Sequence, residues 1–380
     1  MARGETASLS PDAYFDGGWF DRELETVFRS NWLYAGTLCD FPSDGAWVTV
    51  TYGSRSWIIL RSEEGFRCYR NVCSHRHSRI LSNVRGCGPL RCAYHGWTYG
   101  SNGVPTGLPG QRENFDLTPN ERIALKLPQG RAVAIGNFVF FRDAADEDQP
   151  CTRMGEDAVS LLLNLSETFS SPFEIGEDLW RANWKTGVEN TLEPYHATFV
   201  HADSLAQIID LSYQTQLETR FTCHRHELRE ASVGWWSKML GLANIEKSGN
   251  YSDYWHFHIH PNLCIGLTHG SLLSIQSFEP VSAQSVRLRF RLFLPSDRQG
   301  QGSEVMRTTL KRFLSEYNAR ILAEDREPVE ACQAGIRDAA GKALLGESEA
   351  RIGSFQRDLL ADIGLEFISI PKAQSTEVEL

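Results

Sequence analysis

Apolar residues near the start of the chain recur at helical spacing. Four of them lie on one face of a predicted helix: Leu24, Val27, Phe28 and Trp32. Asp21 is suited to cap its first turn. After this helix the pattern changes to short runs typical of β-strands, such as 47–52 and 57–60, separated by Gly and Ser. The strand pattern continues to 138–142, and the acidic, turn-rich stretch 143–150 then indicates a domain boundary.

The second half mixes strands and helices. Residues 285–295 form the clearest strand, because four apolar side chains alternate with three arginines: Val286, Leu288, Phe290 and Leu292 against Arg287, Arg289 and Arg291. A sheet with one buried face and one solvated face is typically antiparallel. The whole pattern predicts an α+β protein, with a small all-β domain followed by a larger domain of helices and strands.

A long amphipathic helix is predicted after this strand. Its apolar stripe has helical spacing and comprises Met306, Leu310, Phe313, Tyr317 and Ile321. We expect the helix to end near Glu324 and Asp325, because Pro328 is suited to the first turn of another helix.

Composition and charge exclude several classes of protein. The 380 residues are 41% hydrophobic and 23% charged, as in globular proteins, and the net charge of −10 disfavours binding to nucleic acid. The longest apolar run, 132–141, is too short to cross a membrane. No secretory signal is visible, so the nine cysteines are interpreted as reduced thiols or metal ligands of a cytoplasmic protein.

Two mixed pairs of metal-binding residues lie in the β-rich region. Cys73 and His75 form one pair, and Cys92 and His95 form the other. Structural zinc sites usually take two cysteines from one tight turn, whereas a Rieske [2Fe–2S] centre takes two cysteines on one iron and two histidines on the other. Zinc is the alternative interpretation. Cys68 and Cys87 have no paired histidine, so we interpret them as structural.

The residues around these pairs resemble the Rieske signature of ring-hydroxylating oxygenases. Arg76 follows the first histidine, and Tyr94, Gly96 and Trp97 surround the second. One residue departs from the pattern, because His77 stands where that family usually has Gly. The resemblance implies that Cys73, His75, Cys92 and His95 hold the cluster.

A second group of candidate ligands lies in the segment from Asn183 to His201. His196 and His201 are five residues apart, with Glu193 just before them. Two imidazoles and a carboxylate form the facial triad of non-haem iron oxygenases. Because a spacing of five does not align side chains on a regular helix, we expect a distortion or helix end between the histidines.

This segment resembles the mononuclear iron segment of the same oxygenases. The resemblance implies that His196 and His201 bind Fe²⁺ and that Glu193 links His196 to a cluster histidine of a neighbouring subunit. Most members have Asp at the position of Glu193, and a subset that acts on quaternary amines has Glu. The third ligand is expected to be Asp325, which lies in an acidic cluster before Glu330 and Gln333. Its neighbour Glu324 is the alternative, expected to be a solvated surface acid.

The resemblance extends over nearly the whole chain. It implies an N-terminal helical segment (1–35) that packs on the catalytic domain, a Rieske domain (36–145) and a helix-grip catalytic domain (146–380). It also implies a terminal oxygenase, in which a ferredoxin or flavin reductase brings electrons from NAD(P)H to the cluster. They would then pass through His95, Glu193 and His196 to the iron, which activates O₂. Because this route crosses between subunits, a homotrimer is expected, with an α₃β₃ complex as the alternative.

Several alternatives stay open on the sequence. Hydroxylation or oxidative demethylation of a small organic substrate and cis-dihydroxylation of an arene use the same ligands. An electron-transfer protein without oxygenase chemistry is the alternative from another class. Other histidines and a tryptophan pair are interpreted as pocket-wall or core residues: His224, His226, His256, His258, His260, Trp235 and Trp236.

Overall fold

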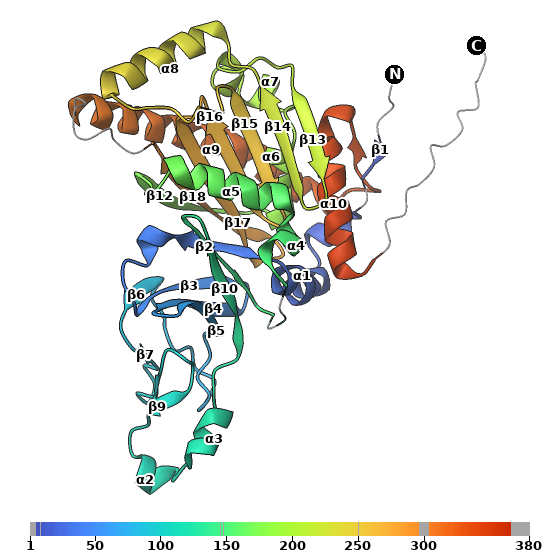
Figure 1. The fold of residues 1–380 in the computed structure, drawn as a ribbon. Coiled ribbons are helices and arrows are strands. Elements are labelled where there is room, and N and C mark those ends of the chain that lie inside the picture. The colour runs from blue at the N-terminus through green and yellow to red at the C-terminus, as the bar shows by residue number, and fades with distance from the viewer. Residues whose placement is uncertain are drawn as a thin grey trace.

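The computed structural model describes residues 5–7, 9–144, 146, 148–249, 251–295 and 304–365. In Figure 1 the chain forms two stacked regions, each built on an antiparallel seven-stranded sheet. The predicted α+β class with antiparallel sheets is therefore confirmed.

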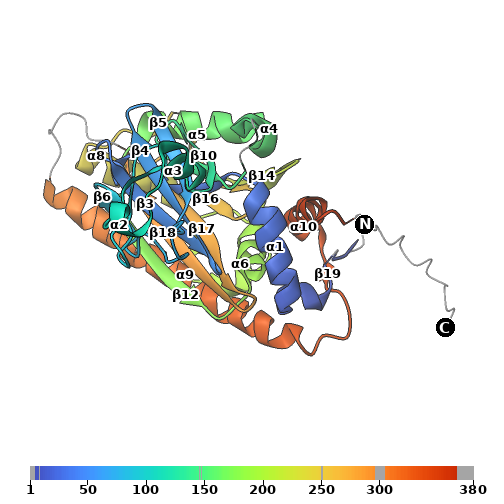
Figure 2. The ribbon, with the colours of Figure 1, turned by 90° about the horizontal axis from the view of Figure 1, so that it is seen from below.

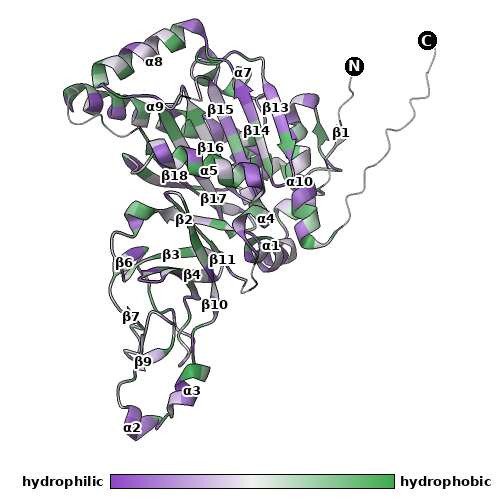
Figure 3. Ribbon diagram, in the orientation of Figure 1, coloured by the Kyte–Doolittle hydropathy of each residue, from purple (hydrophilic) through white to green (hydrophobic). Residues whose placement is uncertain are grey.

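The lower sheet in Figure 1 belongs to the β-rich region. Its strands in spatial order are β2 (Leu33–Thr37), β11 (Phe138–Arg142), β10 (Gln129–Ile135), β5 (Gly65–Arg70), β4 (Arg55–Ser62), β3 (Ala46–Tyr52) and β6 (Arg85–Cys87). Below it lie a small sheet and two short helices, namely β7 (Leu90–Arg91), β8 (Thr98–Tyr99), β9 (Pro105–Gly107), α2 (Gln111–Asn114) and α3 (Pro119–Ala124). Figure 3 shows that β3 and β4 are largely hydrophobic, whereas α2 at the tip is hydrophilic, as expected for a buried sheet and an exposed end.

The upper sheet carries the second half of the chain. Its strands in spatial order are β12 (Glu174–Trp180), β18 (Ser285–Phe293), β17 (Leu272–Ser282), β16 (Leu263–Thr268), β15 (Tyr254–Ile259), β14 (Phe221–His226) and β13 (Gln214–Glu218). The helices around it are α4 (Pro150–Met154), α5 (Glu156–Thr168), α6 (Trp184–Leu192), α7 (Ala197–Val200), α8 (Glu230–Ala243), α9 (Glu304–Ile336) and α10 (Ala350–Ile363). A short ladder pairs β1 (Glu5–Thr6), near the N-terminus, with β19 (Leu344–Leu345), which lies between α9 and α10.

The two faces of the upper sheet have opposite characters. Odd-numbered residues of β14 to β17, such as Phe257, Ile265 and Ile275, form a hydrophobic core with α5 and β11. Even-numbered residues point to the other face, because side chains alternate along a strand. On that face His224, His256, Gly266 and Ser274 are paired across four adjacent strands.

The N-terminal helix differs slightly from the prediction. Helix α1 spans Gly17–Ser30 and is capped by Asp16, whose side chain accepts a hydrogen bond from the Trp19 backbone N–H. The predicted cap at Asp21 is wrong, because the helix begins one turn earlier, where Trp19 and Phe20 already pack against the core. Figure 2 shows α1 beside α10. The buried Trp184 of α6 packs between Phe28 of α1 and Phe355 of α10, with ring centroids 4.9 Å and 5.7 Å away.

The long helix α9 does not end where the sequence suggested. It runs unbroken from Glu304 to Ile336 with Pro328 inside it. Proline cannot donate a backbone hydrogen bond and normally destabilises a helix interior. However, the buried stripe continues across this position, through Leu322, Asp325, Val329 and Gln333. Packing along both halves therefore keeps the helix continuous.

The arginine face of β18 is only partly exposed to solvent. Arg291 pairs with Asp40 of the β-rich region at 2.8 Å, and Arg289 lies 3.4 Å from the buried Glu279. The expected wet face is thus a charged interface between the two regions, although the antiparallel pairing of the strand with β12 and β17 is confirmed.

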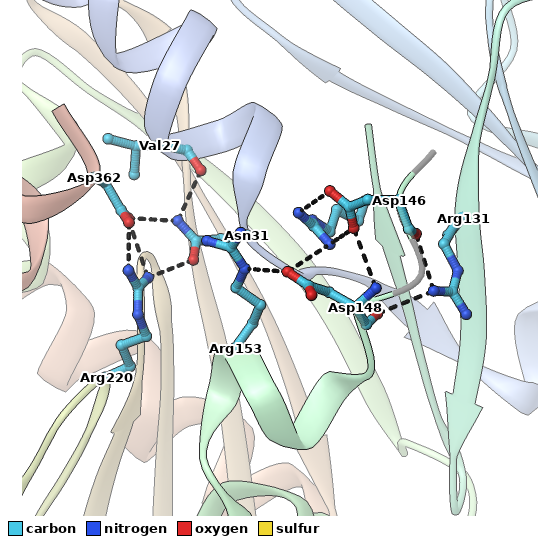
Figure 4. A network of polar contacts seen from close by, with 9 residues as sticks. Val27, Asn31, Arg131, Asp146, Asp148, Arg153, Arg220 and Asp362 are labelled. Carbon is cyan, nitrogen blue, oxygen red and sulfur yellow. Dashed lines mark hydrogen bonds and ion pairs between the residues drawn. The ribbon is translucent and has the colours of Figure 1, made fainter. Parts of the chain in front are cut away.

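Two polar clusters fix the connections near this interface (Figure 4). Asn31 at the end of α1 donates to Asp362 of α10 at 2.6 Å and accepts from Arg220, next to β14, at 2.6 Å. In the second cluster Arg153 donates to Asp148 at 2.8 Å, and Arg142 pairs with Asp146. The first cluster ties both terminal helices to the upper sheet, and the second fixes the start of the link between the regions.

A fully buried ion pair joins α1 to α6. Lys185 Nζ lies 2.5 Å from Glu23 Oε1, and both side chains are 0% exposed. The other oxygen of Glu23 accepts from the Trp184 indole N–H at 2.8 Å. Because removal of one partner leaves a buried charge unpaired, this pair should be sensitive to single substitutions.

We predict that Glu23→Gln destabilises the protein by about 3–5 kcal/mol, and that the double variant Glu23→Leu/Lys185→Met loses less, because it leaves no buried charge. Thermal unfolding midpoints measure both effects. Glu316→Gln is the control, because Glu316 and Arg312 form a pair with side chains 71% and 78% exposed. It should change stability by no more than about 0.5 kcal/mol. Unfolding of Glu23→Gln at the wild-type temperature would contradict this account.

Candidate metal centres and a cavity

The two Cys–His pairs lie on two loops with the same backbone pattern. The Cys73 N–H donates to the Ser78 carbonyl at 2.8 Å, and the Cys92 N–H donates to the Trp97 carbonyl at 2.8 Å. In each loop the residue four positions after the cysteine donates back to the cysteine carbonyl, at 2.9 Å in both cases. The sequence thus builds two matching turns, one after β5 and one between β7 and β8.

These turns explain the departure at His77. His77 and Gly96 occupy equivalent positions, and both have left-handed backbone conformations, with φ of 59° and 72°. Glycine adopts this region without strain, and histidine is among the residues that enter it more often than most. The loop therefore keeps its shape with histidine at this position.

The four side chains of the pairs lie together at the tip of the β-rich region. Cys73 and Cys92 are 2% and 1% exposed and in contact, whereas His95 is exposed. The ring centroids of His75 and His95 are 4.6 Å apart, and His75 stacks on Trp97 at 4.9 Å. Burial raises the pKa of the Cys73 thiol, whose sulfur lies 3.1 Å from the Tyr99 hydroxyl oxygen.

This arrangement fits a [2Fe–2S] cluster. His75 Nδ1 is a buried nitrogen without a hydrogen-bond partner in the described structure, as expected of an atom reserved for a metal. Two buried thiols on one side and two imidazoles nearer the surface match the ligand division of a Rieske centre.

The second candidate centre lies between α6, α7 and α9. Helix α6 ends at Leu192, before both histidines, and the short α7 begins after His196 and ends before His201. The expected helix end between the histidines is therefore confirmed. Ligand atoms of His196, His201 and Asp325 all lie within 4.8 Å of one another. Among the described residues, no other three His, Cys, Asp or Glu side chains form such a group.

Asp325 lies at the centre of this group. Its Oδ1 is 3.0 Å from His201 Nε2 and 3.6 Å from His196 Nε2, and it accepts from the Asn190 amide at 2.8 Å. Asp325 is 7% exposed, because it belongs to the buried stripe of α9. The stripe, and not a break between two helices, turns it inward. Two imidazoles and one carboxylate fit a mononuclear iron.

Glu324 is not a solvated acid, so that expectation is wrong. Its Oε2 lies 2.8 Å from His201 Nδ1 and accepts from the Ser204 hydroxyl at 2.5 Å, and its Oε1 accepts from Arg320 at 2.8 Å. Burial raises the Glu324 pKa, but the hydrogen bonds from Ser204, His201 and Arg320 outweigh it and leave the pKa lowered. Burial lowers the His201 pKa, but contacts with Asp325 and Glu324 raise it overall.

The sequence did not indicate that Glu324 contacts His201, because only one of two neighbouring acids was expected to reach the site. Both do so, because the His201 ring presents one nitrogen to each carboxylate.

Glu193 contacts the other histidine. Its Oε1 lies 2.6 Å from His196 Nδ1, the nitrogen that points away from Asp325. Glu193 ends α6, and its Oε2 also accepts from the His196 backbone N–H at 3.1 Å. Two exposed aromatic side chains follow it, Tyr195 at 64% and Phe199 at 78% exposure.

A cavity of about 140 Å³ opens beside the three clustered side chains. Three histidines of the upper sheet line this cavity, namely His224, His226 and His256. Burial lowers the pKa of each, to about 2 for His224 and well below the usual value for His256, so all three are neutral near pH 7. The remaining wall mixes apolar side chains such as Leu205 and Ile209 with polar ones such as Ser274 and Gln276.

The histidines at the end of β15 and just after it, His258 and His260, have different partners. His258 Nε2 lies 3.2 Å from the Pro261 carbonyl, and His260 Nε2 lies 2.9 Å from Asp362. Trp236 is buried and packs edge-on against Trp235, as expected for core residues. No helix among the described residues is both long and apolar enough to cross a membrane.

Comparison with known proteins follows the same division of the chain. Residues 31–128 match the Rieske [2Fe–2S] domain, and residues 167–363 match the ring hydroxylating alpha subunit (catalytic domain). The chain is 31% identical over 215 residues to the glycine betaine monooxygenase oxygenase subunit of Chromohalobacter salexigens, covering 53% of this chain and 45% of that protein. It is 30% identical over 196 residues to the naphthalene 1,2-dioxygenase large oxygenase component of Pseudomonas aeruginosa, covering 49% and 42%. The chain thus spans about half the length of the curated relatives it matches.

Solved structures show the same fold. A quaternary ammonium Rieske monooxygenase in complex with L-carnitine superposes with a TM-score of 0.74 at 18% identity, covering 95% of each chain. Naphthalene 1,2-dioxygenase with indole bound superposes with a TM-score of 0.74 at 20% identity, covering 94% of this chain and 92% of the other. With its catalytic domain matched over more than half of the sequence and a Rieske domain before it, the chain belongs to the family of ring-hydroxylating oxygenase alpha subunits, as its motifs predicted.

Proposed function

We propose that this protein is a terminal oxygenase that hydroxylates or oxidatively demethylates a small organic substrate. One observation carries the proposal: a Rieske-type donor set and a separate two-histidine, one-carboxylate set occur in one chain, and a cavity opens beside the second set. Its domains would be the N-terminal segment 1–35, the Rieske domain 36–145 and the catalytic domain 146–380.

Eight side chains have assigned roles in this proposal. The [2Fe–2S] cluster would be held by Cys73, His75, Cys92 and His95. The Fe²⁺ ion would be held by His196, His201 and Asp325. Glu193 would couple the two sites. When bound, the cluster supplies single electrons and the iron supplies O₂ activation. The protein's own part is to orient the ligands: Glu193 accepts from His196 Nδ1, and Glu324 accepts from His201 Nδ1. Such contacts fix the tautomer of a metal-binding imidazole and raise its basicity.

The assembly proposed is a homotrimer. Figure 1 places the tip with β7, β9 and α2 at the opposite end of the molecule from α7, so the two donor sets of one chain are far apart. His95 is exposed at that tip, and the aromatic residues after Glu193 are exposed as well. A neighbouring subunit could therefore bring its His95 to Glu193. A ferredoxin or flavin reductase would supply electrons from NAD(P)H in the cytoplasm, where the free thiols of this chain would stay reduced.

Two alternatives differ from this proposal in testable ways. A cis-dihydroxylating arene dioxygenase would use the same ligands, and the naphthalene dioxygenase relative supports it. An electron-transfer protein would need no second metal site and no adjoining cavity, and the grouping of His196, His201 and Asp325 therefore disfavours it.

The Rieske assignment predicts a visible signature. Cys73→Ser or His95→Ala should remove the cluster's visible absorption while the second site still binds iron, because the two sites share no residue. Cys87→Ser is the control, since this cysteine is exposed and outside both donor sets. It should leave the spectrum unchanged. An intact cluster spectrum in either ligand variant would refute the assignment.

The assignment of the mononuclear iron site predicts different effects for substitutions of three acidic residues of α9. Asp325→Ala should abolish iron binding at this site and substrate-dependent O₂ uptake, because two imidazoles alone hold Fe²⁺ weakly. Glu324→Ala should weaken iron binding by about 10–100-fold, and Glu324→Gln less, because its amide oxygen still accepts from His201. The exposed Glu327 on the same helix is the control.

Iron content and O₂ uptake, with a surrogate reductase and a panel of aromatic acids, amines and polycyclic compounds, provide the measurements. No substrate-dependent uptake by wild-type protein from any of these classes would contradict the oxygenase function. Normal iron content in Asp325→Ala would contradict the ligand assignment.

For Glu193 we predict that substitution stops product formation without loss of either metal. Glu193→Gln should retain both metals, because Glu193 is not a proposed ligand, but product formation should collapse. The measurement is the rate at which a pre-reduced protein regains its visible absorption on exposure to O₂ and substrate. A wild-type rate would contradict the bridging role, and loss of iron would instead make Glu193 a ligand.

A further inference from the structure

A buried guanidinium lies behind the histidine wall of the cavity. Arg351 of α10 is 0% exposed. Its Nε donates to the Thr222 hydroxyl at 2.8 Å, one terminal nitrogen donates to the Thr222 carbonyl at 3.2 Å, and the other donates to His256 Nδ1 at 3.1 Å. Thr222 and His256 lie on adjacent strands, β14 and β15. The guanidinium is thus hydrogen-bonded to two strands of the upper sheet, and the His256 ring lies between it and the cavity.

This charge has no carboxylate partner among the residues that the structure describes. No Asp or Glu there forms an ion pair with Arg351, and the ionisable groups that raise its pKa, Cys264, Cys223 and Tyr254, have raised pKa values themselves and are neutral near pH 7. Burial lowers the Arg351 pKa to about 10, so it remains charged near pH 7. Buried charges are normally paired, and His256, which accepts a hydrogen bond from this guanidinium, lines the cavity.

His256 connects the guanidinium of Arg351 to the lining of the cavity. Because Arg351 donates to His256 Nδ1, the neutral His256 ring bears its proton on Nε2, which has no hydrogen-bond partner in the described structure. His224 is directly paired with His256 across the strands, and neither of its ring nitrogens has a hydrogen-bond partner in the same set of residues. Both residues line the cavity.

Two acids also line the cavity. Glu193 and Asp325 are the carboxylates among its lining residues, and both contact His196. The cavity lining therefore combines two imidazoles, one of them bonded to a buried positive charge, with the proposed iron ligands.

We propose that the substrate carries a carboxylate, which binds at the His224–His256 wall and is stabilised by Arg351. This inference rests on the proposed function and specifies its substrate class. A carboxylate accepts hydrogen bonds only and therefore matches neutral imidazole N–H groups, and it supplies the missing counter-charge. Held at this wall, the rest of the molecule would extend toward His196, His201 and Asp325. The cavity, at about 140 Å³, is close to the size of an engineered cavity of roughly 150 Å³ that holds benzene, so the substrate is small.

Matched pairs of probes test the proposal by equilibrium binding. Isothermal titration calorimetry of the intact holoprotein, without reductase and in a buffer free of carboxylates and phosphate, compares benzoate with benzamide and glycine betaine with choline. In each pair the carboxylate should bind about tenfold or more tightly, the range expected of a hydrogen bond to a charged group. Equal affinities within the pairs, or no measurable binding of either carboxylate, would overturn the proposal.

Variants locate the carboxylate. Arg351→Met should reduce carboxylate affinity about tenfold and leave the affinity for the neutral or cationic probe within about twofold. His224→Phe is a second variant that keeps Arg351 and removes no hydrogen bond of the described residues, so it serves if Arg351→Met misfolds. It should reduce the same preference. Arg357→Met, at an exposed position of the same helix, is the control and should bind like wild type.

The outcomes also separate this proposal from the oxygenase function. A carboxylate preference that survives both Arg351→Met and His224→Phe would place the anion on the iron instead and overturn the proposed wall. A preference that is lost in both variants supports the wall even if the protein shows no O₂ uptake, which would contradict the oxygenase function alone. Efficient oxygenation of neutral compounds without any carboxylate preference would contradict the wall alone.

Discussion

The imidazole of His201 is held between two neighbouring carboxylates, and the second candidate centre depends on this contact. Asp325 lies 3.0 Å from one ring nitrogen, and Glu324 lies 2.8 Å from the other. Consecutive helical residues point about 100° apart, so they can meet opposite edges of one ring only if the ring lies against the helix. The break between α6 and α7 brings His201 to that position, and the unbroken α9 supplies both acids. A helix that ended at Pro328 would lack the packing of Val329 and Gln333 that fixes this part of α9.

The upper sheet gives the site its second constraint, because its two faces serve different purposes. One face is apolar and packs on α5 and β11. The other carries paired histidines, a glycine and a serine across four strands, and this face forms the floor of the cavity. The cavity is therefore fixed by strand register: a shift by one residue would exchange His224 and His256 for core residues such as Cys223 and Phe257.

The sequence predicted those parts of the site that depend on short-range pattern. The Rieske candidates were accessible because each Cys–His pair sits within one tight turn, and the two turns share one hydrogen-bond pattern. His196 and His201 were accessible for a similar reason. Asp325, by contrast, lies more than a hundred residues away, and only the family resemblance selected it. The family and the fold class were predicted correctly, whereas the domain boundaries and the individual ligand roles remain predictions.

The errors have one physical cause, which is tertiary packing that overrides local signals. Proline predicted a helix break, but the buried stripe of α9 continues through it. The arginines of β18 predicted a wet face, but Arg291 pairs with Asp40 of the other region. Glu324 was expected in solvent, yet it contacts His201 and Ser204. No sequence pattern indicated the buried Arg351, because its neighbours Thr222 and His256 come from strands far away in the chain.

The central claim is that one chain carries both a Rieske cluster and a separate mononuclear iron. The most direct measurement is the content of iron and acid-labile sulfide per chain in the purified wild-type protein. The account predicts about three irons and about two sulfides per chain, because a [2Fe–2S] cluster contributes two of each and the second site one more iron. About two irons with about two sulfides, unchanged after incubation with excess Fe²⁺, would contradict it and leave an electron-transfer protein.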